Sequence, residues 1–305
     1  MKTGFFSALW GVCCGTSIFP RLIGNSRARV VWHLFLMSLL CTVLVSLRRF
    51  PDIRNDFGGL AKRYVTVFGR QVELSESGIL PELDPDKPRS MVLPLSGSLI
   101  YTAREKSIAI PPGALSTANY LVVWSDRFIS IAVRTGEDKW DIQLMRPGQT
   151  TETVRNIERG AVSGYYDEEL KRLPAADQKW KLSEFQVAAE EIFHLASQLF
   201  SAVWFIGDWL GNFALGLLCT GLFAGLSRLT GATKARNLSS WEYWKIGVYA
   251  GFPGMIIGSV ATALKLPWLT YNIAYMLSLV VYWLPAALAC SPEANERDGA
   301  APPEV

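Results

Sequence analysis

The sequence has 305 residues, of which 50% are hydrophobic and only 19% are charged. A charged fraction below the usual quarter excludes a wholly soluble protein of ordinary composition. The net charge of +3 at pH 7 is too small to favour nucleic acid as a partner. The hydrophobic residues are concentrated in a few long runs, which predicts an integral membrane protein with one sizeable aqueous domain.

Four runs are long and apolar enough to cross a bilayer, which requires about 20 residues in a helix. They predict transmembrane helices over residues 30–47, 195–227, 246–264 and 268–289. The second helix is expected to continue from a helix that starts in water near residue 183, because Ser183 and Gln186 form a capping-box pattern. Ser239 and Glu242 form the same pattern ahead of the third helix. Only three residues separate the last two runs, so a tight antiparallel hairpin is expected there.

The connecting segments differ in their content of basic residues. Residues 1–29 carry Lys2 and three arginines without an acid, and residues 228–245 carry four basic residues against Glu242 alone. Basic residues in short loops favour the cytoplasmic side of the cell membrane. The predicted cytoplasmic parts are an amphipathic N-terminal segment at 1–29, a basic loop at 228–245 and a disordered tail at 290–305. Residues 48–193 are then extracytoplasmic, although Arg48, Arg49 and Arg54 near their start argue for the opposite side.

The aqueous domain reads as an α+β fold. Residues 50 to 182 contain neither cysteine nor histidine, which excludes a disulfide framework and a Cys/His metal site there. Period-two alternation between residues 119 and 145 predicts a small antiparallel sheet. The residues expected to share one face of a strand are Ile129, Ile131 and Val133 in one case and Trp140, Ile142 and Leu144 in the next. Residues 64–68 and 71–74 are predicted as further strands, and residues 151–159 as a short helix that ends at Gly160.

The order of these elements resembles a known family. An aromatic segment from Phe5 to Pro20 leads into one span, a strand-rich domain follows, and Ser239-Ser240-Trp241-Glu242-Tyr243-Trp244-Lys245 opens the third span ahead of Pro253. This plan is similar to an uncharacterised bacterial family of four-span membrane proteins, a domain of unknown function. Some of its members are labelled maltodextrin-utilisation membrane protein. The resemblance implies topology in a bacterial inner or plasma membrane and carries no catalytic residue over to this sequence.

Three polar residues are candidates for chemistry. Asp208 is the one acid inside the second apolar run, and acids within hydrocarbon are functional candidates because burying their charge is costly. The alternative is that Asp208 lies at the outer interface. Glu191 and His194 have the Glu-x-x-His spacing that, in paired copies, holds di-iron in helical bundles. A single copy favours a solvated or headgroup-level helix face instead.

Glycines recur at helical spacing in the second and third spans. They are Gly207, Gly211, Gly221 and Gly225 in the second, and Gly247, Gly251, Gly254 and Gly258 in the third. Small residues let transmembrane helices approach closely, so these faces are expected to pack against other helices of the chain or against a second copy. Pro253 is expected to kink the third helix.

No Ser/His/Asp set, Gly-rich phosphate loop or zinc-ligand spacing occurs in the sequence, and no cofactor or metal is expected. Glu82, Asp84 and Asp86 could together bind a hard cation, but a solvated proline-stiffened loop is the commoner meaning of this pattern. The sequence favours a non-enzymatic membrane protein whose envelope-facing domain senses, binds or scaffolds something. The alternatives are an accessory subunit of a transporter, suggested by the family label for sugars, and a membrane-embedded enzyme that uses Asp208 or Glu191. The expected partners are the lipid bilayer and a membrane protein or second copy.

Overall fold

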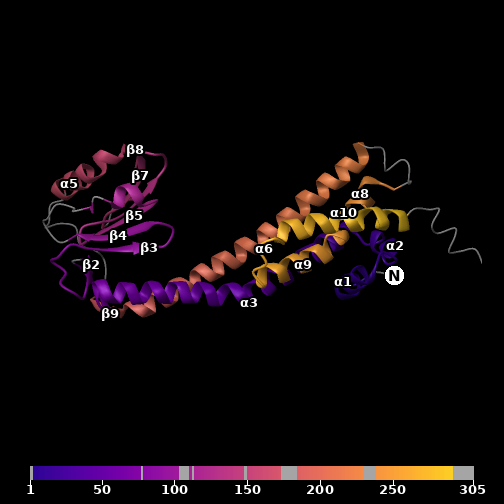
Figure 1. The fold of residues 1–305 in the computed structure, drawn as a ribbon, viewed down its shortest axis with the longest axis horizontal. Helices are drawn as coiled ribbons and strands as arrows, with labels where there is room; N and C mark the ends of the chain where they lie inside the picture. Colours follow the sequence, from indigo (N-terminus) through magenta and orange to yellow (C-terminus); the bar gives the residue numbers. More distant parts are fainter. Residues whose placement is uncertain are drawn as a thin grey trace, which may run out of the picture. The chain divides into compact units, whose positions relative to one another are not determined.

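The computed structural model describes residues 3–76, 78–102, 110–111, 113–147, 150–172, 184–229 and 238–290. Within them, four helical segments are long and apolar enough to cross a membrane. They are α3 (Arg27–Phe68), α6 (Ala189–Leu229), the consecutive pair α8 (Ser240–Ala250) and α9 (Phe252–Ala263), and α10 (Tyr271–Ala289). The chain divides into a helical unit (residues 1–53 and 199–305) and a strand-rich unit (residues 54–198), and both α3 and α6 contribute to each unit (Figure 1).

The N-terminal segment is part of the core of the helical unit. It forms α1 (Phe5–Cys14) and α2 (Phe19–Ile23), and Ala8 and Val12 are fully buried in the same cluster as Tyr249. The other side of α1 exposes Phe6 and Trp10, and none of its ten residues is charged. The prediction of an amphipathic segment is therefore wrong for α1, because this helix is apolar on both faces and one face packs on the bundle.

The third span is interrupted where the sequence predicts a kink. The Ser239 backbone N–H donates to Glu242 Oε2 (2.6 Å) and the Glu242 N–H donates to Ser239 Oγ (3.3 Å), so the predicted capping box is confirmed and α8 begins at Ser240. The helix breaks at Gly251, and Pro253 occupies the first turn of α9, where its missing N–H is not needed. The predicted hairpin is also confirmed, since α9 and α10 pack together along their lengths.

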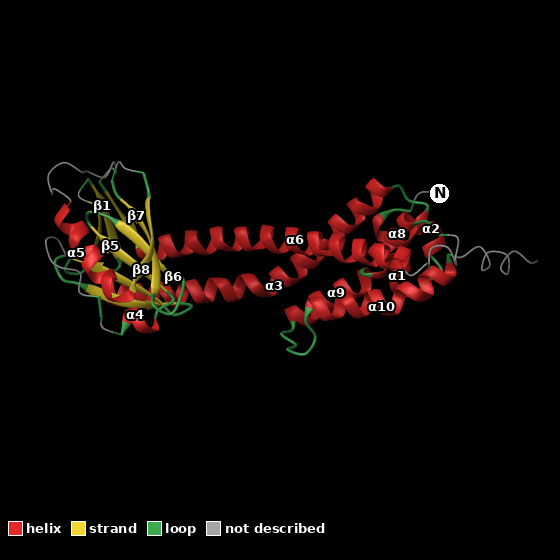
Figure 2. Ribbon diagram, turned by 90° about the horizontal axis from the view of Figure 1, so that it is seen from above, coloured by secondary structure: helices red, strands yellow, loops and turns green. Residues whose placement is uncertain are grey.

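The strand-rich unit contains two sheets (Figure 2). The three-stranded sheet has the order β2-β1-β9 and is antiparallel, and the six-stranded sheet has the order β3-β4-β5-β6-β7-β8. The strands are β1 (Gln71–Ser75), β2 (Gly78–Pro81), β3 (Arg89–Leu93), β4 (Gly97–Thr102), β5 (Tyr120–Ser125), β6 (Ile129–Arg134), β7 (Lys139–Met145), β8 (Glu152–Glu158) and β9 (Phe185–Ala188). Because β4 pairs with β5 in parallel, the larger sheet is mixed rather than purely antiparallel as predicted.

Short helices accompany the larger sheet. The helix α4 (Ala114–Thr117) lies in the crossover that makes the parallel pair possible, and the 3₁₀ turn Arg159–Ala161 leads into α5 (Val162–Arg172). The ion pair between Arg146 Nη2 and the buried Glu169 Oε2 (2.5 Å) and the bond from Arg127 Nη1 to the Leu170 carbonyl (3.0 Å) hold α5 on the sheet. Tyr166 of α5 is fully buried, and this burial raises the pKa of its phenol.

The prediction of a strand at residues 64–68 is wrong, because these residues form the last turn of α3. The run Tyr64-Val-Thr-Val-Phe68 has the β-branched composition of a strand, but helical spacing places Tyr64 and Phe68 on the same buried side. The strand predicted at 71–74 is confirmed as β1.

The short helix predicted at 151–159 is also wrong, because these residues form β8. Asn156 has a positive φ of 60°, and its N–H donates to Asp141 Oδ1 (2.9 Å). The register with β7 shifts between Trp140 and Ile142, so the two inward residues, Val154 and Ile157, are three positions apart. A bulge in a strand thus imitates helical spacing.

The start of the second long helix differs from the prediction as well. Ser183 lies outside the described residues, and residues 185–188 form β9, so α6 begins at Ala189 rather than near 183. The unit boundaries at 53/54 and 198/199 lie a few residues from the predicted domain limits of 48 and 193. The predicted tail from residue 291 onward and residues 230–237 of the predicted basic loop lie outside the described residues.

Both faces of the six-stranded sheet are covered. Trp140, Ile142 and Leu144 are fully buried on the face that α5 covers, as predicted. In β6, however, that core takes Ser130 and Ala132, whereas Ile129 packs in the aromatic cluster of the other face and Val133 is exposed. The alternation of β6 was therefore recognised, but its buried residues are largely the opposite set.

Candidate functional site

The strand-rich unit joins the ends of α3 and α6 directly. The chain leaves α3 through Gly69, which has φ = +100°, and enters β1, and β9 passes into α6 without a loop. β1 and β9 are antiparallel partners, and the Ala189 N–H donates to the Arg70 carbonyl (2.8 Å). The two helix ends are thus fixed to one another by backbone hydrogen bonds. We call this junction, residues 68–71 and 188–189, the helix-end joint.

Glu82 holds the turn between α3 and β1. Its Oε2 accepts hydrogen bonds from the backbone N–H groups of Arg70 (2.6 Å) and Gln71 (2.9 Å). Of the other two acids in its loop, Asp84 forms an ion pair with Lys87 (2.5 Å). No group of three metal-capable side chains occurs among the described residues, so nothing in the geometry favours a cation at this loop.

An aromatic cluster connects the helix-end joint to the six-stranded sheet. We call it the joint cluster; its rings are those of Tyr64, Phe68, Tyr101, Trp124 and Phe193. Trp124 is central, with ring centroids 5.6 Å from Phe68 and 5.0 Å from Tyr101, and its Nε1 donates to the Ile79 carbonyl of β2 (2.8 Å). One side chain thus contacts α3, both sheets and the ring system that reaches α6. Aromatic pairs of this kind contribute stability beyond their buried area.

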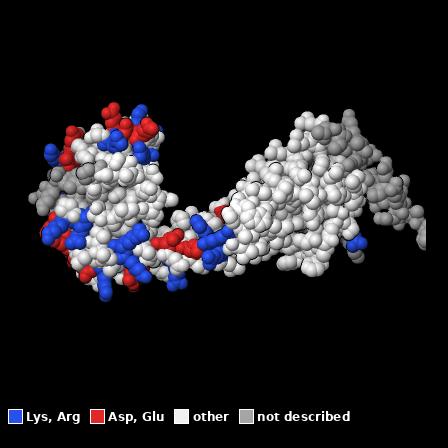
Figure 3. All heavy atoms as spheres, viewed as in Figure 1, with Lys and Arg blue, Asp and Glu red and all other residues white. Residues whose placement is uncertain are grey.

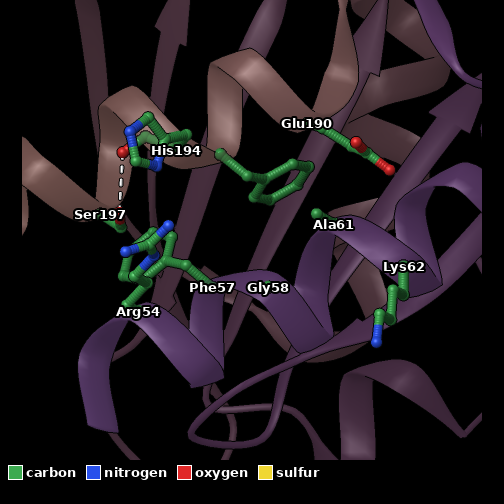
Figure 4. Close-up of a pocket in the computed structure, with 9 residues that line it drawn as sticks. Arg54, Phe57, Gly58, Ala61, Lys62, Glu190, His194 and Ser197 are labelled. Atoms are coloured by element: carbon green, nitrogen blue, oxygen red, sulfur yellow. Dashed lines mark hydrogen bonds between the residues drawn. The ribbon is translucent and has the colours of Figure 1, made fainter. Parts of the chain in front are cut away.

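Beside the joint cluster, a pocket of about 270 Å³ opens between α3 and α6 (Figure 4). We call it the interhelical pocket. It is lined by Arg54, Phe57, Gly58, Ala61 and Lys62 of α3 and by Glu190, Phe193, His194 and Ser197 of α6. All nine residues belong to the strand-rich unit. Its lining combines an apolar floor with three potentially cationic side chains and one acid.

The polar groups divide between two ends of the pocket. Figure 4 shows Arg54, His194 and Ser197 toward one end, and Glu190 and Lys62 toward the other. Ser197 Oγ donates to the His194 carbonyl (2.7 Å), and Gln198 Nε2 lies 3.0 Å from His194 Nε2. On the face seen in Figure 3, Lys, Arg, Asp and Glu side chains gather over the strand-rich unit, whereas the helical unit is almost free of them.

Of the Glu-x-x-His pair predicted from sequence, only one member reaches this site. His194 lines the interhelical pocket, whereas Glu191 is exposed and is not among the lining residues. The acid of the pocket is its neighbour Glu190. Glu191 therefore lies outside the pocket that His194 lines.

Asp208 has hydrogen-bond partners within the helical unit. Its Oδ2 accepts from Thr42 Oγ1 (2.9 Å) and from Asn212 Nδ2 (3.0 Å), and Asn212 Nδ2 also lies 3.3 Å from Thr42 Oγ1. The three side chains join α3 to α6 in a half-buried polar cluster. Interhelical hydrogen bonds of this kind stabilise helix pairs in membranes, so the geometry at Asp208 favours a packing role.

A second polar cluster in the helical unit was missed from the sequence. Tyr249 OH accepts from Asn25 Nδ2 (3.0 Å) and lies 2.8 Å from His33 Nδ1, and all three residues are buried. Lys245 Nζ donates to the Ile23 carbonyl (2.6 Å) nearby. These contacts hold the N-terminal segment on α8. Residue types alone gave no signal, because the partners are more than 200 positions apart.

The predicted glycine faces have two different outcomes. In α8 and α9 the glycines pack closely, since a Cβ at Gly258 would lie 2.8 Å from Tyr271 Cα, and one at Gly254 would collide with the Ala274 carbonyl. In α6, a Cβ at Gly207, Gly211, Gly221 or Gly225 would meet no described atom within 4 Å. The predicted helix packing is confirmed within the chain for the third span only.

The chain matches no family model, and comparisons with curated proteins and with solved structures give no match. The family resemblance drawn from the order of elements therefore stays a prediction. Function is therefore inferred from the geometry of the helix-end joint, the joint cluster and the interhelical pocket.

Proposed function

We propose that the chain is a non-enzymatic, four-span protein of a bacterial cell membrane, with its strand-rich unit on the envelope side. We further propose that this unit senses, binds or scaffolds an envelope component and passes the event to the helices. The observation that carries the proposal is the joint cluster, in which α3, the sheets and the start of α6 share one core. Four apolar helices and the uneven distribution of basic residues support the placement.

A displacement of the strand-rich unit would be transmitted to the helices because the helix-end joint is tightly packed and has no flexible loop between β9 and α6. Packed cores respond to displacement as rigid bodies because their side chains interdigitate at crystal-like density. A shift of β4 or β5 would press on Trp124 and through it on Phe68. No flexible loop intervenes between β9 and α6, so the same shift would rotate or tilt the helix rather than be absorbed.

Complementation separates this proposal from a membrane-embedded enzyme. A strain without its chromosomal copy is scored for growth under osmotic shock and detergent stress after re-expression of variants at equal membrane abundance. We expect Asp208→Asn and Glu191→Gln to restore growth like the unaltered chain, because neither acid is needed for transmission. Trp124→Ala should fail, whereas Trp124→Phe, which retains an aromatic ring in the joint cluster, should restore growth.

Two results would contradict the proposal in different ways. Failure of Asp208→Asn or Glu191→Gln at full abundance would favour the embedded enzyme. Full restoration by Trp124→Ala would show that the strand-rich unit does not act through the joint cluster.

A further inference from the structure

We infer that the interhelical pocket binds a phosphate group, either free in solution or carried on a lipid headgroup, between Arg54 and His194. This site goes beyond the proposed function, because it stands on the pocket's own geometry and holds whether or not binding is passed to the helices. Four observations support it, namely unused donors, an apolar floor, an open position at Gly58 and the place of the pocket along α3.

The pocket contains hydrogen-bond donors that no described residue uses. The side chains of Arg54 and Lys62 make neither an ion pair nor a hydrogen bond with any described residue. Gln198 Nε2 lies 3.0 Å from His194 Nε2, and the other ring nitrogen of His194, Nδ1, contacts no polar group among the described residues. Donors that have no partner among the described residues favour an anion, and a planar guanidinium pairs well with phosphate oxygens.

The floor of the pocket strengthens this preference. Phe57, Ala61 and Phe193 supply apolar surface between the charged groups. Apolar surface beside the donors lowers the local dielectric, so an anion over this floor would be held more firmly than one on an open basic surface. Glu190, the one acid of the lining, lies with Lys62 at the other end from Arg54 and His194 (Figure 4).

Gly58 is a lining position with room for a side chain. A Cβ at this position would meet no described atom within 4 Å, and Gly58 lines the pocket. A larger side chain could therefore be added at the pocket without displacing any described group. The adjacent Gly59 is equally unobstructed but does not line the pocket, which provides a matched control on the same helix.

The position along α3 explains why both sources of phosphate need testing. Arg54 follows Leu47, the end of the predicted first span, by about two helical turns. The end of the pocket that contains Arg54 is then close to the predicted headgroup layer, where a phospholipid phosphate would be in reach. The pocket of about 270 Å³ is also large enough for a free phosphate with its water or a small phosphorylated solute.

The test uses the purified full chain in a neutral detergent. Isothermal titration calorimetry measures inorganic phosphate, and native mass spectrometry counts adducts of phosphatidylglycerol in competition with phosphatidylcholine. The pocket variants are Gly58→Leu, which adds a bulky side chain at a lining position, and Arg54→Gln, which removes the guanidinium charge. Their matched controls are Gly59→Leu and Arg63→Gln, both at exposed positions of α3 that do not line the pocket. Leucine is a better helix former than glycine, so both leucine variants should fold.

We expect at least a tenfold loss of affinity in each pocket variant and less than a twofold change in each control. Binding of phosphatidylglycerol alone would identify a lipid headgroup as the source, and binding of inorganic phosphate would identify a soluble one. The inference is overturned if the unaltered chain binds neither probe, or if the controls weaken binding as much as the pocket variants. If Gly58→Leu fails to fold, the affinities of Arg54→Gln and Arg63→Gln are compared instead, and equal affinities overturn the inference.

Discussion

Replacing Trp124 with alanine is expected to lower the free energy of unfolding of the strand-rich unit by about 3–5 kcal/mol, the usual cost of deleting a buried aromatic side chain. Trp124 is only 7% exposed and contacts Tyr64, Phe68 and Tyr101. Its removal opens a cavity and leaves the Ile79 carbonyl without its donor. Urea-dependent pulse proteolysis of the full chain in detergent measures the loss.

The rates of amide hydrogen exchange report specifically on the joint cluster. In Trp124→Ala, amides of residues 60–68 should exchange faster together with those of β4 and β5, because these segments share one core. Phe185→Ala serves as the control, since Phe185 is 52% exposed and its loss should change stability by less than about 0.5 kcal/mol. Faster exchange that stays within the sheet would contradict the idea that the helix ends belong to this core.

Gly254→Val is expected to destabilise the helical unit by about 1–3 kcal/mol or more, as overpacking does when the obstacle is backbone. A Cβ at Gly254 would collide with the Ala274 carbonyl and Ser278, and would lie 2.9 Å from Tyr275 Cα. α9 and α10 would have to separate along their closest approach, because a carbonyl cannot rotate away as a side chain can. Titration with a denaturing detergent, followed by tryptophan fluorescence, measures the effect.

Gly211→Val is the matched control for this prediction. It makes the same chemical change in α6, where a Cβ meets no described atom within 4 Å, and it should leave the titration midpoint unchanged. Equal destabilisation by both variants would mean that the α6 glycines pack against something as closely as those of α9. Equal tolerance of both would contradict the close approach of α9 and α10.

The sequence predicted those elements that local physics determines. Long apolar runs marked the four helical segments, the Ser239–Glu242 pattern located the start of α8, and the alternation of Trp140, Ile142 and Leu144 identified β7. The errors arose where tertiary contacts override local preference. Tyr64 to Phe68 reads as a strand but continues a helix into the joint cluster, and a bulge at Asn156 gives β8 the spacing of a helix.

The candidate site was much less predictable than the fold. His194 was singled out for its spacing to Glu191, but its neighbours in the pocket, Arg54 and Phe57, come from a helix about 140 positions earlier. Asp208 was recognised as unusual, whereas its partner Thr42 had no distinguishing pattern. Such long-range pairings depend on how α3 and α6 lie together, and hydrophobic periodicity carries no information about that arrangement.

The proposed function depends most on the claim that the strand-rich unit faces the envelope side of the membrane. The test places Glu137→Cys in a chain with Cys13 and Cys14 changed to serine and Cys41, Cys219 and Cys290 changed to alanine. Glu137 lies in the exposed turn between β6 and β7, whereas Ser125, at the end of β5, is buried and would be a poor labelling site. A companion chain keeps Glu137 and the exposed Cys13 and Cys14, with the other three cysteines as alanine.

Both chains are treated in intact cells with a membrane-impermeant maleimide and again after lysis. With the strand-rich unit on the envelope side, we expect Glu137→Cys to be labelled in intact cells, and Cys13 and Cys14 to be labelled only after lysis. Labelling of Glu137→Cys only after lysis would contradict this placement, because the strand-rich unit would then face the cytoplasm and could not sense an envelope component.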